Sequence, residues 1–352
     1  METQDLPTTL RPLRLGELLD RAIRLYRANF LTFIGIIAVV YVPLMVLQTA
    51  AAALMNSSLM GGRFSTPEEI FTNVGYWIGI LATIVLTLVR FILVQGIATG
   101  ALTRAVSDNY LGKKTGILDA YRGIGNSWPS LLGALLFIVL IVFLLFLWWL
   151  VPCIGWVTGL GMIGFMTAAI NPLVPPVVVL EHKGAIDSVR RAWSLARRRF
   201  WPLLGYVLVL ALFSLIVVNG PTAIANVILL QVFRSFGDPT TQLVLSSIIQ
   251  GLVSLVFILI YYPLQMTAFT LIYFDLRVRT EGFDIALLTM GVSDSTQLTE
   301  AIAAPVPQAD ERLITGPDLG NFAILTLAGI GLYVFFISFV TGGVLFFSSL
   351  FR

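Results

Sequence analysis

The sequence predicts an all-α protein: a polytopic transmembrane helix bundle of about seven spans, built from three degenerate repeats of an interfacial amphipathic helix and a helical hairpin. The first observation behind this prediction is composition. Of 352 residues, 57% are hydrophobic and only 12% are charged, and the mean hydropathy is +0.91. A soluble domain carries about 25% charged residues, so water cannot cover this surface and lipid must solvate much of it. The other two observations are the order of apolar runs and basic connectors, and an internal repeat.

Seven apolar segments are long enough to cross about 30 Å of hydrocarbon at ~1.5 Å per residue. We place them at 30–55, 74–105, 129–151, 155–180, 201–219, 243–274 and 321–348. Prolines 172, 175 and 176 interrupt the fourth segment, and such a break is tolerated at membrane depth only where it is buried or lines a cavity. We expect the apolar stretch 222–236 to form a separate short helix outside the membrane or at its surface.

The basic residues indicate orientation, because cytoplasmic loops of membrane proteins are rich in Lys and Arg. Most of them fall before the first span and in every second connector after it. We therefore expect a multi-pass protein with its N-terminus in the cytoplasm and its C-terminus outside. The expected divisions are a cytoplasmic N-terminus with an amphipathic helix (1–29), a six-span membrane domain (30–280), an acidic cytoplasmic linker (281–319) and an additional C-terminal helix (320–352).

Three connectors resemble one another: Leu15–Gly35, Thr115–Gly133 and Lys183–Gly205. Each has a glycine, an acid, a basic and aromatic stretch, and then an aromatic residue that opens an apolar run with an early glycine. In the third copy, apolar side chains follow one helical stripe, and Arg190, Arg191 and Arg197 lie on the other side with Asp187, four residues before Arg191. Such a helix is expected to lie in the headgroup plane, with its arginines attracting anionic lipids.

At these segments the chain resembles a known family. The stretches LRPLRLGELLDRAIRLYRANF (10–30), VVVLEHKGAIDSVRRAWSLARRRFWPLLG (177–205) and YYPLQMTAFTLIYFDLRVRTEGFD (261–284) resemble the membrane domain of glycerophosphoryl diester phosphodiesterases. The resemblance covers roughly residues 10–285 and includes the stand-alone bacterial proteins that carry this domain without the enzyme. It implies a multi-pass protein of a bacterial plasma membrane with about six helices, and it says nothing about residues 286–352.

Residues that carry catalysis or bind metals are scarce. The chain has one histidine, His182, which we expect in a solvated turn, and one cysteine, Cys153, which we expect to be a buried thiol. No phosphate-binding or dinucleotide motif is present, and the glycines of GWVTGLGMIG (155–164) and Gly96 and Gly100 suit close helix packing. We therefore expect no catalytic residues, no metal, no cofactor, no nucleic-acid partner and no enzyme activity.

Arg90 is a charged residue in the middle of the second apolar run. An arginine at that depth costs a few kcal/mol unless it faces protein or water, so it is either part of a polar site or reaches an interface. We take Gln95, Gln250 and Gln265 as its candidate partners. At the end of the sixth span, Asp275 and Arg279 are spaced for an i,i+4 pair that anchors the helix.

The leading functional hypothesis is a non-catalytic accessory or scaffold protein that engages anionic lipids or partner proteins at the cytoplasmic face. Protein partners and a homo-oligomer are left open. The alternative is a small-solute or anion transporter or channel with a site near Arg90. The candidate docking residues are Arg14, Arg21, Arg24, Arg27, Arg190, Arg191, Arg197, Arg198 and Arg199.

Overall fold

The computed structural model describes residues 11–61, 74–233, 239–283 and 314–350, and every regular element in these ranges is a helix. Seven helical segments among them are long and apolar enough to cross a membrane, which confirms the prediction of a multi-pass all-α membrane protein. In chain order the elements are α1 (Leu15–Ala28), α2 (Phe30–Gly61), α4 (Val74–Arg90), η1 (Phe91–Ala98), α5 (Thr99–Tyr110), α6 (Ile117–Gly123), α7 (Ser127–Trp149), α8 (Ile154–Phe165), η2 (Met166–Ile170), η3 (Asn171–Leu173), α9 (Val174–Glu181), α10 (Ala185–Arg198), α11 (Phe200–Ser214), η4 (Leu215–Asn219), α12 (Gly220–Phe233), α13 (Pro239–Glu281) and α16 (Gly316–Leu350).

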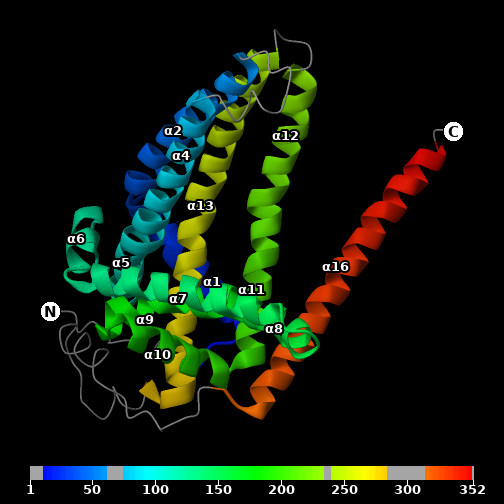
Figure 1. Cartoon of the computed structure of the whole chain (residues 1–352). Helices are drawn as coiled ribbons and strands as arrows, with labels where there is room; N and C mark the ends of the chain where they lie inside the picture. The colour runs from blue at the N-terminus through cyan, green and yellow to red at the C-terminus, as the bar shows by residue number, and fades with distance from the viewer. Residues whose placement is uncertain (1–10, 62–73, 234–238, 284–313, 351–352) are drawn as a thin grey trace.

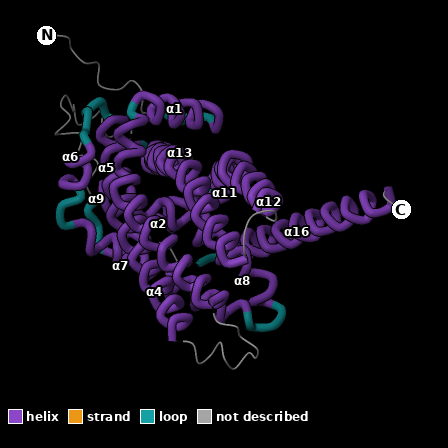
Figure 2. Tube along the Cα trace, turned by 90° about the horizontal axis from the view of Figure 1, so that it is seen from above, coloured by secondary structure: helices purple, strands orange, loops and turns teal. Residues whose placement is uncertain are grey.

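The long helices do not all run in the same direction. In Figure 1, α2, α4, α13 and α12 stand upright, with α13 packed against α2 and α12. Helices α7 and α8 pack on each other and run across the view, at a steep angle to the upright helices. Helix α16 starts against α8 and then extends away from the other helices, as the view from above also shows (Figure 2).

The fifth apolar run is longer than the sequence suggested. Helices α11, η4 and α12 follow one another without a break, so the expectation of a separate helix at 222–236 is wrong. Pro221 has no N–H to donate, so one backbone hydrogen bond is missing close to the junction of η4 and α12. The Thr222 hydroxyl donates to the carbonyl oxygens of Val218 and Asn219 at 2.8 and 3.0 Å and satisfies acceptors near the proline.

The expected break in the fourth span is present. A π-helical turn (η2) and a 3-10 turn (η3) precede α9, and they carry the chain through Pro172, Pro175 and Pro176. Pro175 and Pro176 are buried, as are all the other residues of α9. Within the irregular turns, Met166, Ala169, Ile170 and Leu173 are buried and Thr167 is exposed. The broken helix is thus covered by protein over much of its length, as expected for such a break at membrane depth.

The three repeats share one order of elements, because a helix of 14, 7 or 14 residues precedes a long apolar helix in α1–α2, α6–α7 and α10–α11. Their early glycines have a packing role in two of the three copies. A Cβ on Gly35 would lie 2.5 Å from Ile117, the first residue of α6, and a Cβ on Gly133 would lie 3.1 Å from Ala185, the first residue of α10. Each of these glycines therefore receives the amphipathic helix of the next repeat, whereas Gly205 of the last repeat has no such neighbour within 4 Å.

The apolar faces of α1 and α10 are covered by protein rather than by lipid, which corrects the expectation for these helices. Helix α1 runs antiparallel along α13: the Leu13 N–H donates to Asp275 near one end, and the Tyr26 hydroxyl donates to the Ile260 carbonyl near the other. Helix α10 packs its buried face against α7, α9 and α13. Burial raises the pKa of Tyr26 to about 12, so its hydroxyl keeps the proton that it donates.

Helix α16 is fixed at its start by close contact with α8. A Cβ on Gly161 would lie 2.2 Å from the Phe322 carbonyl oxygen, and the Gly161 N–H donates to the Thr326 hydroxyl at 2.8 Å. This confirms the packing role expected for Gly161, whereas Gly96 and Gly164 face open space and that expectation is wrong for them.

Three further expectations concern His182, Cys153 and the linker 281–319. His182 is exposed with φ of 52°, as expected for a turn residue. Cys153 is also exposed, with φ of 64°, so the prediction of a buried thiol is wrong. Most of the expected linker 281–319 lies outside the described residues, and α16 begins within it at Gly316.

Candidate functional site

A cavity of about 360 Å³ surrounds the side chain of Arg90. Arg90 lies in the middle of the 37-residue apolar segment Val74–Tyr110, at the junction of α4 and η1. The other lining residues come from α2, α4, η1, the α11–η4 junction and α13, and they are Tyr41, Thr87, Phe91, Val94, Gln95, Ser214, Val218, Ile258, Tyr261, Tyr262 and Gln265. The cavity thus combines one cation with amide and hydroxyl groups on apolar walls.

Arg90 is hydrogen-bonded but not neutralised. Its Nη1–H donates to the amide oxygen of Gln48 on α2 at 3.2 Å, and Tyr41 on the same helix also interacts with the guanidinium. Within the described part of the chain, no carboxylate lies within salt-bridge distance of Arg90. A cation held in this way favours an anion in the cavity.

Irregular helices form two walls of the cavity. The π-helical segment η1 starts directly after Arg90 and contributes Phe91, Val94 and Gln95, and η4 contributes Val218. On α13 the lining residues Tyr261, Tyr262 and Gln265 flank Pro263. π-helical turns are rare and occur often at functional sites, because the extra residue changes the direction of side chains and of backbone groups.

Two of the three glutamines predicted to accompany Arg90 line this cavity. The Tyr262 hydroxyl donates to Gln95 at 3.2 Å and shares a 2.7 Å hydrogen bond with Thr99, so α13 and the second span are joined beside Arg90. Gln250 is exposed and does not line the cavity, so its assignment is wrong. Gln48 was missed, although it is a polar residue in an otherwise apolar run.

A second cluster of charges lies at the other end of α13 and forms a closed ring of hydrogen bonds, which we call the ion ring. It consists of Glu181, Arg191, Tyr273, Arg277 and Glu281. Arg191 donates to Glu181 at 3.1 Å and to Glu281 at 2.7 Å. Arg277 donates to Glu281 and to the Tyr273 hydroxyl, each at 3.2 Å, and that hydroxyl donates to Glu181 at 2.8 Å.

The ion ring is buried, and its two arginines balance its two glutamates. Lys183, outside the ring, also pairs with Glu181 at 3.3 Å. The side chains of the ring's two arginines and two glutamates are between 1% and 4% exposed. Burial acts to lower the pKa of Arg191, but the hydrogen bond to Glu281 and the charges of Glu181 and Glu281 outweigh it, and the net shift is upward. Arg191 therefore stays charged, and its role is to join α10 to the ends of α9 and α13 rather than to reach a lipid.

The expected pair of Asp275 and Arg279 is confirmed and has a further partner. Arg279 donates to Asp275 at 2.8 Å, while Leu13 donates its N–H to Asp275 and accepts a hydrogen bond from Arg279 at its carbonyl. This pair and the ion ring lie on the last turns of α13. Parts of the segments 10–30, 177–205 and 261–284 therefore meet at this end of the helix.

The nine arginines predicted to dock lipids or partners differ in their surroundings. Arg191 is part of the ion ring, so its assignment to a docking surface is wrong. Arg197 forms an ion pair with Asp318 of α16 at 3.3 Å, and Arg21 donates to the Tyr110 hydroxyl at 3.3 Å. Arg199 is half-buried, and the exposed members are Arg14, Arg24, Arg27, Arg190 and Arg198.

Metal chemistry has no evident site in the part of the chain that the structure describes, where no three His, Cys, Asp or Glu side chains are grouped to hold an ion. The fold and the cavity define a multi-pass helical membrane protein with a cationic intramembrane cavity. Comparisons with protein-family models, with curated proteins and with solved structures give no match for the chain.

Proposed function

We propose that the protein binds a small anion, or the anionic group of a larger molecule, in the cavity at Arg90, as a small-solute or anion transporter or channel does. The cavity walls offer hydrogen-bond donors from the guanidinium, from amides and from hydroxyls. Such groups suit a phosphate or a carboxylate. The family resemblance, which includes stand-alone membrane domains without an enzyme, accords with a binding role that has no catalytic step.

One observation carries this proposal: Arg90 faces a cavity of about 360 Å³ in the middle of a candidate span, and its partner Gln48 is neutral. An ionisable side chain within a membrane helix is costly and is usually kept for a function. The size falls in the range of roughly 300–1,000 Å³ that is typical of small-molecule pockets.

A thermal-stability measurement on the full-length protein in detergent tests the proposal. The probes are inorganic phosphate, acetate and a short-chain phosphatidic acid, which separate a free anion, a carboxylate and a lipid headgroup. A ligand at 100 times its Kd stabilises the folded state by about 2.7 kcal/mol, so the melting temperature should rise with at least one probe. Uptake of labelled probe into proteoliposomes then distinguishes transport from binding.

Arg90→Gln should remove the shift, and Arg27→Gln, which removes an exposed charge on α1, should retain it. An equal shift in Arg90→Gln, or no shift with any of the three probes, contradicts the proposal.

Docking of anionic lipids or of a protein partner on α1 and α10 is a second candidate. It is favoured by the five exposed arginines, Arg14, Arg24, Arg27, Arg190 and Arg198. Each contributes about 1 kcal/mol of attraction near an anionic surface. Under this proposal these arginines face the cytoplasm of a bacterial cell from its plasma membrane. A reporter fused within Lys183–Gly184 tests that orientation, and an external signal contradicts it.

A further inference from the structure

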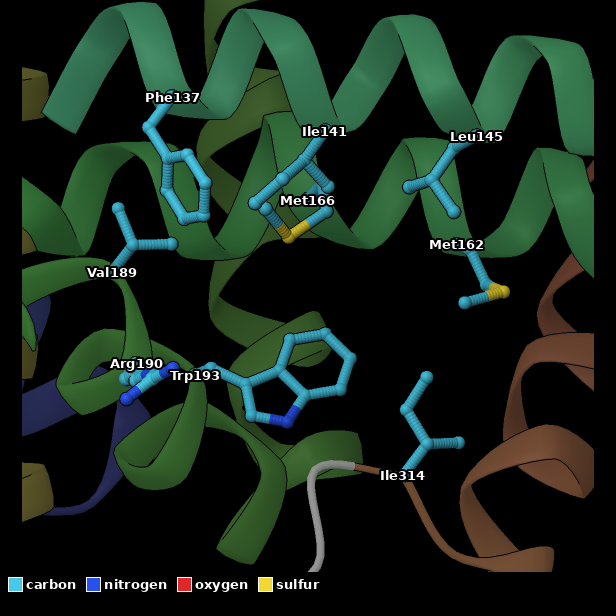
Figure 3. Close-up of a pocket in the computed structure, with 9 residues that line it drawn as sticks. All are labelled: Phe137, Ile141, Leu145, Met162, Met166, Val189, Arg190, Trp193 and Ile314. Carbon is cyan, nitrogen blue, oxygen red and sulfur yellow. The ribbon is translucent and has the colours of Figure 1, made fainter. Parts of the chain in front are cut away.

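A second cavity, of about 280 Å³, lies between the crossing α7–α8 hairpin and α10 (Figure 3). Phe137 and Ile141 extend into it from α7, and Met162 and Met166 line it from α8 and η2. The indole of Trp193 on α10 forms the opposite wall. The walls are therefore hydrocarbon, thioether and aromatic groups.

Arg190 is the one charged residue at this cavity, next to Trp193 on α10. It is exposed, and no described acid lies within salt-bridge distance of it. Its neighbour Arg191 points the other way and is bonded to Glu181 and Glu281. The two adjacent arginines thus differ completely: one is neutralised inside the protein, and the other is available to an anion beside an apolar cavity.

We propose that this cavity receives an acyl chain of an anionic phospholipid whose phosphate group binds Arg190. The inference deepens the second candidate function, because it replaces a diffuse basic surface by one seated lipid molecule.

Three observations favour a lipid over other occupants. The hairpin that covers the cavity exposes large apolar side chains on its outer surface, so lipid surrounds it. The cavity, of about 280 Å³, is lined by apolar side chains apart from Arg190, so it suits part of a hydrocarbon chain. The positive charge beside it matches a phosphate, and the thioethers of Met162 and Met166 adapt to chains of irregular shape.

A photolabelling experiment on the full-length protein tests this proposal. The protein is reconstituted in phosphatidylcholine vesicles that contain a trace of phosphatidylglycerol with a photoreactive acyl chain. After illumination, labelled peptides are mapped by mass spectrometry. The label should concentrate on the inner face of α7 and on α8, and the same photoreactive chain on phosphatidylcholine should label these peptides less.

Arg190→Gln should reduce labelling of the cavity by phosphatidylglycerol about fivefold, the equivalent of ~1 kcal/mol per arginine near an anionic surface. The matched control Arg122→Gln, an exposed arginine on α6, should leave it unchanged. Ile141→Phe, which fills the cavity and keeps Arg190, should also reduce the label.

Equal losses in Arg190→Gln and Arg122→Gln overturn the seated lipid and leave only diffuse attraction to positive charge. Labelling of the cavity that does not depend on the headgroup, or label spread evenly over the lipid-facing helices, overturns the proposal as well.

Discussion

Helix α13 contributes to two polar regions, one buried and one part-buried, that differ in how their charges are balanced. At its end, the ion ring holds two arginines and two glutamates in direct contact. About 24 Å along the helix, at a rise of ~1.5 Å per residue, Gln265 and its neighbours face the cavity of Arg90, whose hydrogen-bond partner is a neutral amide.

We infer from this difference that the charges of the ion ring have a structural role, whereas the charge of Arg90 has a functional one. In the ion ring every charged side chain has an opposite charge as its neighbour, so the cluster gains nothing from a ligand and its geometry joins α9, α10 and α13. The Arg90 cavity has space and an uncompensated cation. A buried ion pair is weak evidence for function, whereas an intramembrane cation beside a cavity is stronger evidence.

The largest expected effect is the loss of one member of the ion ring. Arg191→Met removes the cation that Glu181 and Glu281 share, so the buried cluster loses one positive charge and keeps Lys183 and Arg277 as ion-pair partners of the two glutamates. This change should reduce the free energy of unfolding by about 3–5 kcal/mol. Denaturant titration in detergent measures the change. The matched control is Arg190→Gln, the exposed neighbour, which should change stability by no more than about 0.5 kcal/mol. Similar losses in the free energy of unfolding for the two variants would contradict the structural role given to the ion ring.

A second variant tests whether the ion ring acts as a unit. Combining Arg191→Met with Glu281→Gln removes one charge of each sign, so it should cost less than the sum of the two single changes. The coupling free energy should be about 0.5–3 kcal/mol, as measured by a double-mutant cycle. Additive costs would show that the ring members contribute independently.

Giving Arg90 an acidic neighbour should make its cavity resemble the ion ring. In Gln48→Glu a carboxylate replaces the amide 3.2 Å from the guanidinium, so the arginine becomes neutralised and the anion should no longer bind. At 100 times its Kd, an anion stabilises the folded state by about 2.7 kcal/mol and so raises the melting temperature. In Gln48→Glu this rise should disappear. Gln48→Met, which adds no charge, should retain the shift, and retention of the shift in Gln48→Glu would contradict the role given to Arg90.

The smallest expected effect on stability is that of Arg90→Gln. This change loses one hydrogen bond and removes a poorly solvated cation, so the free energy of unfolding without ligand should change by less than about 1 kcal/mol. The same denaturant titration measures it. A loss of several kcal/mol, comparable to that of Arg191→Met, would show that Arg90 is a structural residue.

The sequence predicts the helices better than their directions. Composition and run length identify all seven candidate spans, and the repeats place α1, α6 and α10 ahead of their apolar helices. The crossing of α7 and α8 was not predicted, because hydropathy measures length and burial but contains no angle. The continuity of η4 and α12 was missed because Gly220-Pro221 looks like a helix break when the adjoining π-helical turn is unknown.

The site was predicted only in part, for a related reason. Gln95 and Gln265 stand out as amides in apolar runs, but depth is not visible in a helix of 43 residues, and Gln250 lies about 22 Å from Gln265 along it. The hydrogen bond between Gln48 and Arg90 depends on how α2 packs against α4, which the sequence does not show. Arg191 was assigned to the exposed face with Asp187 as its partner, whereas its partners Glu181 and Glu281 lie 10 and 90 residues away in the sequence.

The most direct test of the central claim is an experimental density map of the full-length protein in lipid nanodiscs, determined with and without phosphate. The account predicts Arg90 beside Gln48 in an open cavity, with additional density at the guanidinium when phosphate is present. An Arg90 side chain extended to the lipid headgroups, or one paired with a carboxylate in a closed bundle, would contradict it.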